Sequence, residues 1–273
     1  MMFPRPSGRM KFPRPLGRMM SPRPPAEYRM IEGPPPRDGV SHRWRRWNLR
    51  GNPMGALSPD GWADAAVVEL GPILDALRPR RGAVELIGPT GRGKTTTLFA
   101  LLASLRRSRV DVRYHYFPPD GPGPPIADAD VILIDEIRRL PGRHRRSLMR
   151  GPRNLVWTAH RSCIREARRS GRSLTRLHVG PANDWHRIRA VVDRRLELFR
   201  DGPGPLPRVT DLGLRNRFAS CRGNVRSVLD GLYPMFEQWA DQESSSSDVS
   251  ATTGFRRVPM PCTVTEQTSP GRK

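Results

Sequence analysis

Apolar positions recur along the chain with two different periods, and each period predicts a different kind of element. Ser58 is a good helix N-cap, Pro59 suits a first helical turn, and the apolar residues from there to Leu77 recur at helical spacing. Beyond them, five apolar segments have the length and continuity of strands buried in a parallel sheet. These segments are residues 83–87, 110–116, 131–134, 155–158 and 174–179.

The connections between these segments predict how the strands are arranged. A helix is expected at residues 95–105, directly after the first strand, and three of the gaps are long enough for crossover connections. The predicted fold class is therefore α/β, with a parallel sheet of about five strands.

Only helical periodicity follows the sheet. Apolar residues between Ile188 and Phe199 lie on one helical face, and so do those between Val225 and Trp239. We therefore divide the folded part into an α/β domain at residues 52–182 and a small C-terminal helical lid at residues 183–240.

Both ends of the chain lack such periodicity. Residues 1–51 are rich in proline and arginine, and residues 241–273 are rich in serine, aspartate and threonine. Segments with so little to bury are expected to be disordered. The first is either a basic tether for nucleic acid or the product of a start codon placed too far upstream, and we expect the fold to survive removal of residues 1–50.

The charge of the chain indicates a polyanionic partner. Lysine and arginine number 48 against 26 acidic residues, which gives a net charge of +22. However, Lys11, Lys94 and Lys273 are the only lysines, and such a skew toward arginine is more typical of nucleotide bias in a genome than of a binding face. Charge alone therefore leaves DNA binding open.

The cysteines and the hydropathy predict a cytoplasmic protein without a membrane partner. Cys163, Cys221 and Cys262 are widely separated and lack metal-ligand spacing, so they indicate neither a disulfide framework nor a zinc site. No apolar run approaches the ~20 residues that span a bilayer, and the start of the chain lacks the apolar stretch of a signal peptide.

A glycine-rich motif lies between the first predicted strand and the helix after it. Gly88, Gly93, Lys94 and Thr95 have the P-loop spacing, and this context allows backbone N–H groups to hold phosphates at a helix N-terminus. Lys94 is expected to bridge the β- and γ-phosphates of ATP, and Thr95 to ligate Mg²⁺. The expected nucleotide-binding residues are Gly88, Pro89, Thr90, Gly91, Arg92, Gly93, Lys94, Thr95 and Thr96.

Two carboxylates end the strand at residues 131–134. Ligands of parallel sheets bind at the carboxyl ends of the strands, so Asp135 is expected to hold Mg²⁺ through water and Glu136 to polarise the attacking water. The second carboxylate favours hydrolysis over transfer to a small molecule. A guanine-specific Asn/Thr-Lys-x-Asp element has no lysine available to it, so ATP is the expected nucleotide.

Together these motifs resemble those of the AAA+ ATPases over residues 52–240, in particular the origin-recognition and transposition-helper branches. The resemblance implies that Thr158, with His160 in reserve, is the sensor-1 residue, and that Arg226 in Gly223-Asn-Val-Arg is the sensor-2 arginine. It also implies that Arg195 is an interface arginine acting on a neighbouring subunit, and hence that ATP-loaded copies assemble.

Two features depart from that family. The proline-rich connection between residues 116 and 131 is too short for the usual crossover helix, and little chain follows Trp239 to form a winged-helix DNA reader. A role on DNA is therefore not implied along with the ATPase role.

Three functions remain as alternatives. The first is an ATP-hydrolysing switch or assembly factor. The second is a basic nucleic-acid-binding protein that uses nucleotide structurally, in which Trp44 and Trp47, interleaved with arginines, stack on bases; the same cluster could instead pack against the folded part. The third is a P-loop kinase of a small molecule, which leaves Glu136 without a role.

Overall fold

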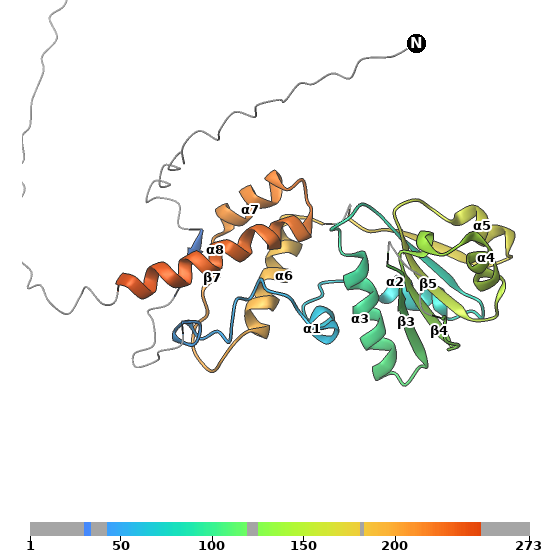
Figure 1. The fold of residues 1–273 in the computed structure, drawn as a ribbon, viewed down its shortest axis with the longest axis horizontal. Coiled ribbons are helices and arrows are strands. Elements are labelled where there is room, and N and C mark those ends of the chain that lie inside the picture. Colours follow the sequence, from blue (N-terminus) through green and yellow to red (C-terminus); the bar gives the residue numbers. More distant parts are fainter. Residues whose placement is uncertain (1–29, 34–42, 119–124, 181–182, 247–273) are drawn as a thin grey trace, which may run out of the picture.

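A parallel sheet forms the centre of the α/β part of the molecule. The structure is a computed structural model of the chain and describes residues 30–33, 43–118, 125–180 and 183–246. Five parallel strands lie in the order β3-β4-β5-β2-β6 (Figure 1), which confirms the predicted fold class. Their bounds are β2 Ala83–Ile87, β3 Val112–Tyr116, β4 Val131–Asp135, β5 Asn154–Ala159 and β6 Leu174–His178.

Helices cover both faces of the sheet. On one face, α2 (Gly71–Leu77) and α3 (Lys94–Arg107) bury leucines against β2, β3, β4 and β5. On the other face, α4 (Gly142–Arg150) and α5 (Ile164–Arg169) contribute Met149 and Ala167 to a second apolar cluster. The strands are apolar on both sides because both sides are covered.

The single helix expected after Ser58 is two short helices. Ser58 caps α1 (Pro59–Asp64) as predicted, with its side-chain oxygen accepting a hydrogen bond from the N–H of Gly61. The chain then leaves the helical path, and α2 begins at Gly71 with Pro72 in its first turn. Proline has no N–H and its ring would clash inside a continuous helix, so Pro72 begins a new helix instead.

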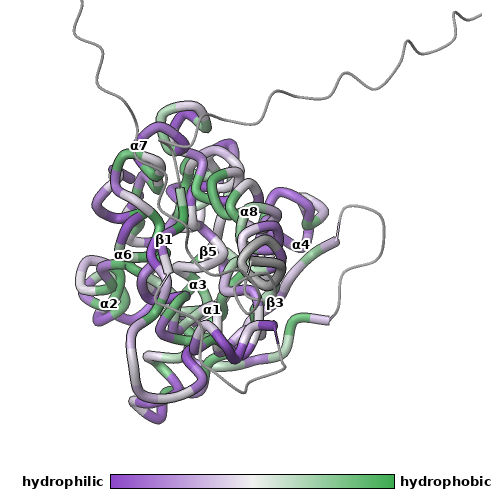
Figure 2. Tube along the Cα trace, turned by 90° about the vertical axis from the view of Figure 1, so that its left-hand side faces the viewer, coloured by the Kyte–Doolittle hydropathy of each residue, from purple (hydrophilic) through white to green (hydrophobic). Residues whose placement is uncertain are grey.

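The C-terminal part is a helical lid, formed by α6 (Trp185–Leu198), α7 (Asp211–Ser220) and α8 (Val225–Ser246). Their apolar faces meet in a third cluster that includes Ile188, Leu214 and Phe236. Figure 2 shows these faces as alternating hydrophobic and hydrophilic stretches along α6 and α7. Helix α8 extends past the predicted boundary at residue 240, so the start of the expected C-terminal tail is helical.

The prediction that the N-terminal tail is disordered is wrong for residues 43–51. A short 3₁₀ helix, η1 (Arg45–Trp47), lies there, and Trp47 and Leu49 are buried in the lid cluster. The ring of Trp47 lies 4.7 Å from that of Trp239 on α8. Residues 30–33 also join the lid through a pairing of β1 (Ile31–Glu32) with β7 (Arg208–Val209). Isolated large apolar side chains can fill a core without any periodicity.

Parts of three expectations fall on residues that the structure leaves out. Residues 1–29 and 247–273 of the expected tails, and residues 119–124 of the β3–β4 connection, lie outside the described residues. The described flanks of that connection contain no helix. Among the helices that the structure describes, none combines the length and the hydropathy needed to cross a bilayer.

A buried carboxylate ties the central strand to the segment after β5. Glu85 on β2 is fully buried and accepts hydrogen bonds from the indole N–H of Trp157, the hydroxyl of Ser162 and the backbone N–H of Cys163. The guanidinium of Arg176 on β6 completes the set, with Nε 3.0 Å from the carboxylate. A buried charge needs such partners, so this network holds β2, β5 and β6 in register.

Candidate functional site

The glycine-rich loop has the conformation that phosphate binding requires. It connects the end of β2 to Lys94, the first residue of α3, so the free N–H groups of the helix N-terminus face the loop. Gly91 and Gly93 have φ angles of 75° and 99°, which side-chain-bearing residues rarely adopt. A Cβ on Gly91 would also lie 2.0 Å from the side-chain oxygen of Asn224 in the lid. Glycine is therefore required at Gly91 on two grounds.

Lys94 lies above this loop and is buried. Its ammonium donates hydrogen bonds to the carbonyl of Gly88 at 2.8 Å and to that of Pro89 at 3.0 Å. Burial lowers the pKa of Lys94, while the nearby charges of Glu136 and Asp135 raise it. Burial removes water from the Lys94 ammonium. An anion bound at the loop would interact with the ammonium in place of that water.

The carboxylate of Asp135 accepts hydrogen bonds from side chains of three different elements. Its Oδ2 accepts from the hydroxyl of Thr95 at 2.8 Å and from the phenol of Tyr114 at 3.2 Å, and its Oδ1 accepts from the hydroxyl of Thr158 at 2.5 Å. These residues come from α3, β3 and β5. Burial, followed by the Asp135 charge, raises the pKa of Tyr114, so the phenol stays protonated as a donor. Tyr114 was not among the predicted site residues, because a strand tyrosine carries no motif.

The donor set around Asp135 fits Mg²⁺. The Thr95 hydroxyl and the Asp135 carboxylate are hard oxygen donors that already touch, so one cation could contact both. Among the described residues there is no group of three or more His, Cys, Asp or Glu side chains that could hold a metal alone. A cation here would need phosphate oxygens and water as further ligands, which is the usual environment of Mg²⁺.

Glu136 is held in an unusual backbone conformation next to Asp135. Its φ of 61° lies in the left-handed region, which costs free energy for a residue with a side chain and is common at functional sites. Its N–H donates to Thr158 Oγ1 at 2.8 Å, and its side chain lies 3.1 Å from His160 Nε2. The hydroxyl of Thr158 thus orients both acidic residues, and the structure brings together Thr158 and His160, the two sensor-1 candidates.

Arg226 belongs to the same site. It lines a cavity of about 220 Å³ together with Lys94, Thr95, Asp135 and Glu136. Helix α8 begins beside the glycine-rich loop, where Asn224 caps it by accepting from the N–H of Ser227. The backbone N–H of Arg226 donates to the carbonyl of Gly91 at 3.4 Å, so the first turn of the lid helix lies against the loop.

The lid also contacts the loop through hydrogen bonds of Arg92. Its guanidinium donates to the carbonyl of Arg222 at 2.6 Å, and its own carbonyl accepts from the side chain of Asn183 at 3.2 Å. The loop therefore contacts the segments before α6 and before α8, so a change in the loop would be transmitted to the lid.

Arg195 is enclosed within its own chain and does not line the cavity that contains Lys94 and Glu136. It is 2% exposed, and its guanidinium donates to the carbonyls of Pro53 and Gly55 and lies over the ring of Trp62. Burial lowers the pKa of Arg195 to about 10. A side chain enclosed in this way does not reach a neighbouring subunit, so its position supports a structural role and gives no support to the expected interface role.

An apolar cleft adjoins the loop between α1 and the lid. Its volume is about 60 Å³, and Val67, Val179, Ile188 and Val191 are among the residues that line it beside Gly93. The sequence analysis missed this cleft, because apolar residues that line a cleft follow the same helical periodicity as those that fill a core.

Comparisons with known proteins give only distant structural likenesses. No protein-family model matches the chain, and no curated protein matches it significantly. Similar solved structures include a DNA replication initiation factor, AMPPCP-bound DnaA from Aquifex aeolicus, and DnaA bound to AMPPCP and single-stranded DNA. Their identities to this chain are 14%, 16% and 14%, and their TM-scores are 0.43, 0.42 and 0.41.

Each comparison covers 71% of this chain and 69%, 72% and 70% of the other chains, respectively. At TM-scores below 0.5, nothing about activity or partners transfers to this chain from the likeness.

Proposed function

We propose that this chain binds ATP with Mg²⁺ and hydrolyses it to ADP and phosphate. The observation that carries the proposal is the convergence of Lys94, Thr95, Asp135 and Glu136 on one cavity at the carboxyl ends of β2 and β4. These side chains arrive from distant segments of the sequence. Each has the chemistry that phosphoryl transfer to water needs.

Each of these residues has a separate role in binding or hydrolysis. The loop N–H groups and Lys94 bind the phosphates, and Thr95 and Asp135 hold the cation. Mg²⁺, when bound, supplies positive charge to the phosphate oxygens. Glu136 accepts a proton from the attacking water, and its contact with His160 orients the carboxylate. Arg226, whose side chain faces the same cavity, contacts the γ-phosphate from the lid.

The lid gives this site a means of acting as a switch. We assign the adenine base to the apolar cleft beside Gly93, because that cleft joins the loop to the lid and is lined mainly by apolar side chains. Nucleotide bound there would contact α1, α6 and α8 at once. Its hydrolysis would remove the γ-phosphate from Arg226 and change the balance of contacts that hold the lid.

The alternative functions have less support. Trp44 and Trp47 are largely buried, so they do not offer the stacking surface expected of a nucleic-acid binder. A nucleic-acid partner then rests on net charge alone. A small-molecule kinase would have no use for the orienting contacts made by Glu136.

Thr158 provides a test of the proposed mechanism. Thr158→Val keeps the side-chain volume but removes the hydroxyl that orients Asp135 and Glu136, so we expect kcat to fall about 10-fold to 100-fold, as for other residues that orient metal-binding carboxylates. Affinity for ATP should stay within about threefold, since Thr158 does not touch the loop. Steady-state hydrolysis and nucleotide titrations measure both quantities.

Thr175→Val on the edge strand β6 is the matched control. It makes the same chemical change three strands away from Asp135 and should leave kcat unchanged. An equal loss in the two variants, or none in Thr158→Val, would contradict the orienting role.

A further inference from the structure

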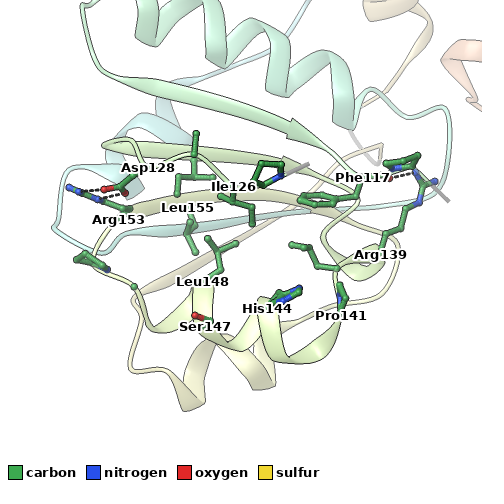
Figure 3. A pocket seen from close by; sticks show the side chains of 17 residues that line it. Phe117, Ile126, Asp128, Arg139, Pro141, His144, Ser147, Leu148, Arg153 and Leu155 are labelled. Atoms are coloured by element: carbon green, nitrogen blue, oxygen red, sulfur yellow. Dashed lines mark hydrogen bonds and ion pairs between the residues drawn. The ribbon is translucent and has the colours of Figure 1, made fainter. Parts of the chain in front are cut away.

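A second and larger cavity lies on the face of the sheet opposite α3. Its volume is about 610 Å³, and it is bounded by β4, β5 and α4 (Figure 3). The described flanks of the β3–β4 connection contain no helix that would cover this part of the sheet. The strand residues Ile132 and Leu155 are among those that line the cavity. We call it the docking cavity.

The floor of the docking cavity is apolar and its ends are polar. Figure 3 shows Ile126, Leu148 and Leu155 in its middle. At one end Arg153 pairs with Asp128, with nitrogen and oxygen 2.6 Å apart. At the other end lies Arg139, which donates to the carbonyl of Phe117 at 2.7 Å and makes no ion pair with any described residue.

Basic side chains lie at the edges of this floor and near it. Arg139, His144 and Arg153 line the docking cavity, and helix α4 also exposes Arg143, Arg146 and Arg150 outside that lining. None of these last three arginines forms an ion pair within the described part of the chain. A basic rim around an apolar floor is the complement of a segment with an apolar anchor between carboxylates.

We propose that the docking cavity binds an acidic segment of a partner protein through one or two large apolar side chains. A nucleic acid fits less well, because bases bind by stacking on exposed aromatic rings, and the partly exposed apolar side chains in the middle of the cavity, Ile126 and Leu148, are aliphatic. Aliphatic pockets of this kind receive the anchor residues of a peptide.

Arg139 connects the docking cavity to the nucleotide site. It lines both cavities, and it ends the 3₁₀ helix η2 (Ile137–Arg139) that directly follows Glu136. A carboxylate of the bound segment that pairs with Arg139 would pull on the backbone next to Glu136. Partner binding and nucleotide state are therefore linked, and this link rests on the proposed ATPase function.

The test uses the full chain and a phage-displayed library of random dodecapeptides. We expect the selected peptides to combine aspartate or glutamate with leucine or an aromatic residue. Their affinities are then measured by fluorescence anisotropy for the unchanged protein and for a His144→Asp, Ser147→Asp double variant. Both positions are exposed and line the docking cavity, so the variant should fold and bind at least about tenfold more weakly.

A second double variant controls for net charge. Arg165→Gln with Arg168→Gln lowers the charge by the same amount on the exposed face of α5, away from the docking cavity, and should change affinity less than about twofold. No enrichment of acidic apolar peptides, or equal weakening by both double variants, would overturn the proposal. So would a single-stranded oligonucleotide that displaces the peptides and loses affinity through the substitutions at His144 and Ser147, because the cavity would then belong to nucleic acid.

The link to nucleotide is tested in the same assay. Peptide affinity should differ by about threefold or more between the nucleotide-free protein and protein with ATP and Mg²⁺. Equal affinities, in a protein that binds ATP, would overturn the link but not the docking. A protein that binds no ATP would instead contradict the proposed function, while peptide binding through the docking cavity would stand.

Discussion

Glu136→Gln should bind ATP as tightly as the unchanged protein and hydrolyse it about 10² to 10⁴ times more slowly. Glutamine keeps the size of the side chain and loses the carboxylate that accepts the proton of the attacking water. Binding is spared because the glycine-rich loop and Lys94 hold the phosphates. The measurements are nucleotide affinity by titration and phosphate release under saturating ATP.

Glu69→Gln is the matched control for this result. Glu69 is exposed and precedes α2, so the same chemical change should alter neither binding nor turnover. Unchanged hydrolysis in Glu136→Gln would remove Glu136 as the base and leave His160, 3.1 Å from it, as the next candidate. A loss of binding in the same variant would mean that Glu136 holds the nucleotide.

Removal of residues 1–51 should unfold the helical lid, contrary to what the composition of that segment suggests. The deletion takes Ile31, Trp44, Trp47 and Leu49 out of the lid cluster. Each large buried apolar side chain contributes about 1.5–3 kcal/mol, so the loss is comparable to the entire stability of a typical domain, about 5–15 kcal/mol. Circular dichroism during thermal unfolding would show the loss of helix and a lower Tm.

A shorter deletion is the control. Removal of residues 1–29 takes away none of the contacts that the structure describes. A separate variant, Trp47→Ala, should lower the free energy of unfolding by about 3–5 kcal/mol. A protein lacking residues 1–51 that keeps its helix content and Tm would show that the packing of Trp47 against Trp239 contributes little.

The sequence predicts which residues come together at the proposed nucleotide site, because its signals are local. The glycine-rich loop, the strand before it and the acidic pair after β4 are each contiguous in sequence, and parallel strands necessarily place them at one edge. Thr158 was predicted from the resemblance to AAA+ ATPases, and it lies near the carboxyl end of β5 at the same edge. The sheet was predictable for a related reason, because strands covered on both faces appear as short continuous apolar runs.

Features that depend on distant partners were not predictable. Glu85 lies in an otherwise apolar strand, and only the fold brings Trp157, Ser162 and Arg176 to it. Trp47 belongs to the lid although its own segment has no periodicity. Nothing in the sequence distinguishes an arginine enclosed by its own chain from one at a surface, which is why Arg195 resembled an interface residue.

The central claim is that the cavity around Lys94 binds and hydrolyses ATP, and Mg²⁺-dependent phosphate release by the full chain tests it most directly. The account predicts release from ATP that stops when Mg²⁺ is chelated and is absent in Lys94→Ala, which also fails to bind ATP because the ammonium that faces the phosphates is gone. Release that persists unchanged in Lys94→Ala, or an unchanged protein that binds no ATP, would contradict the account.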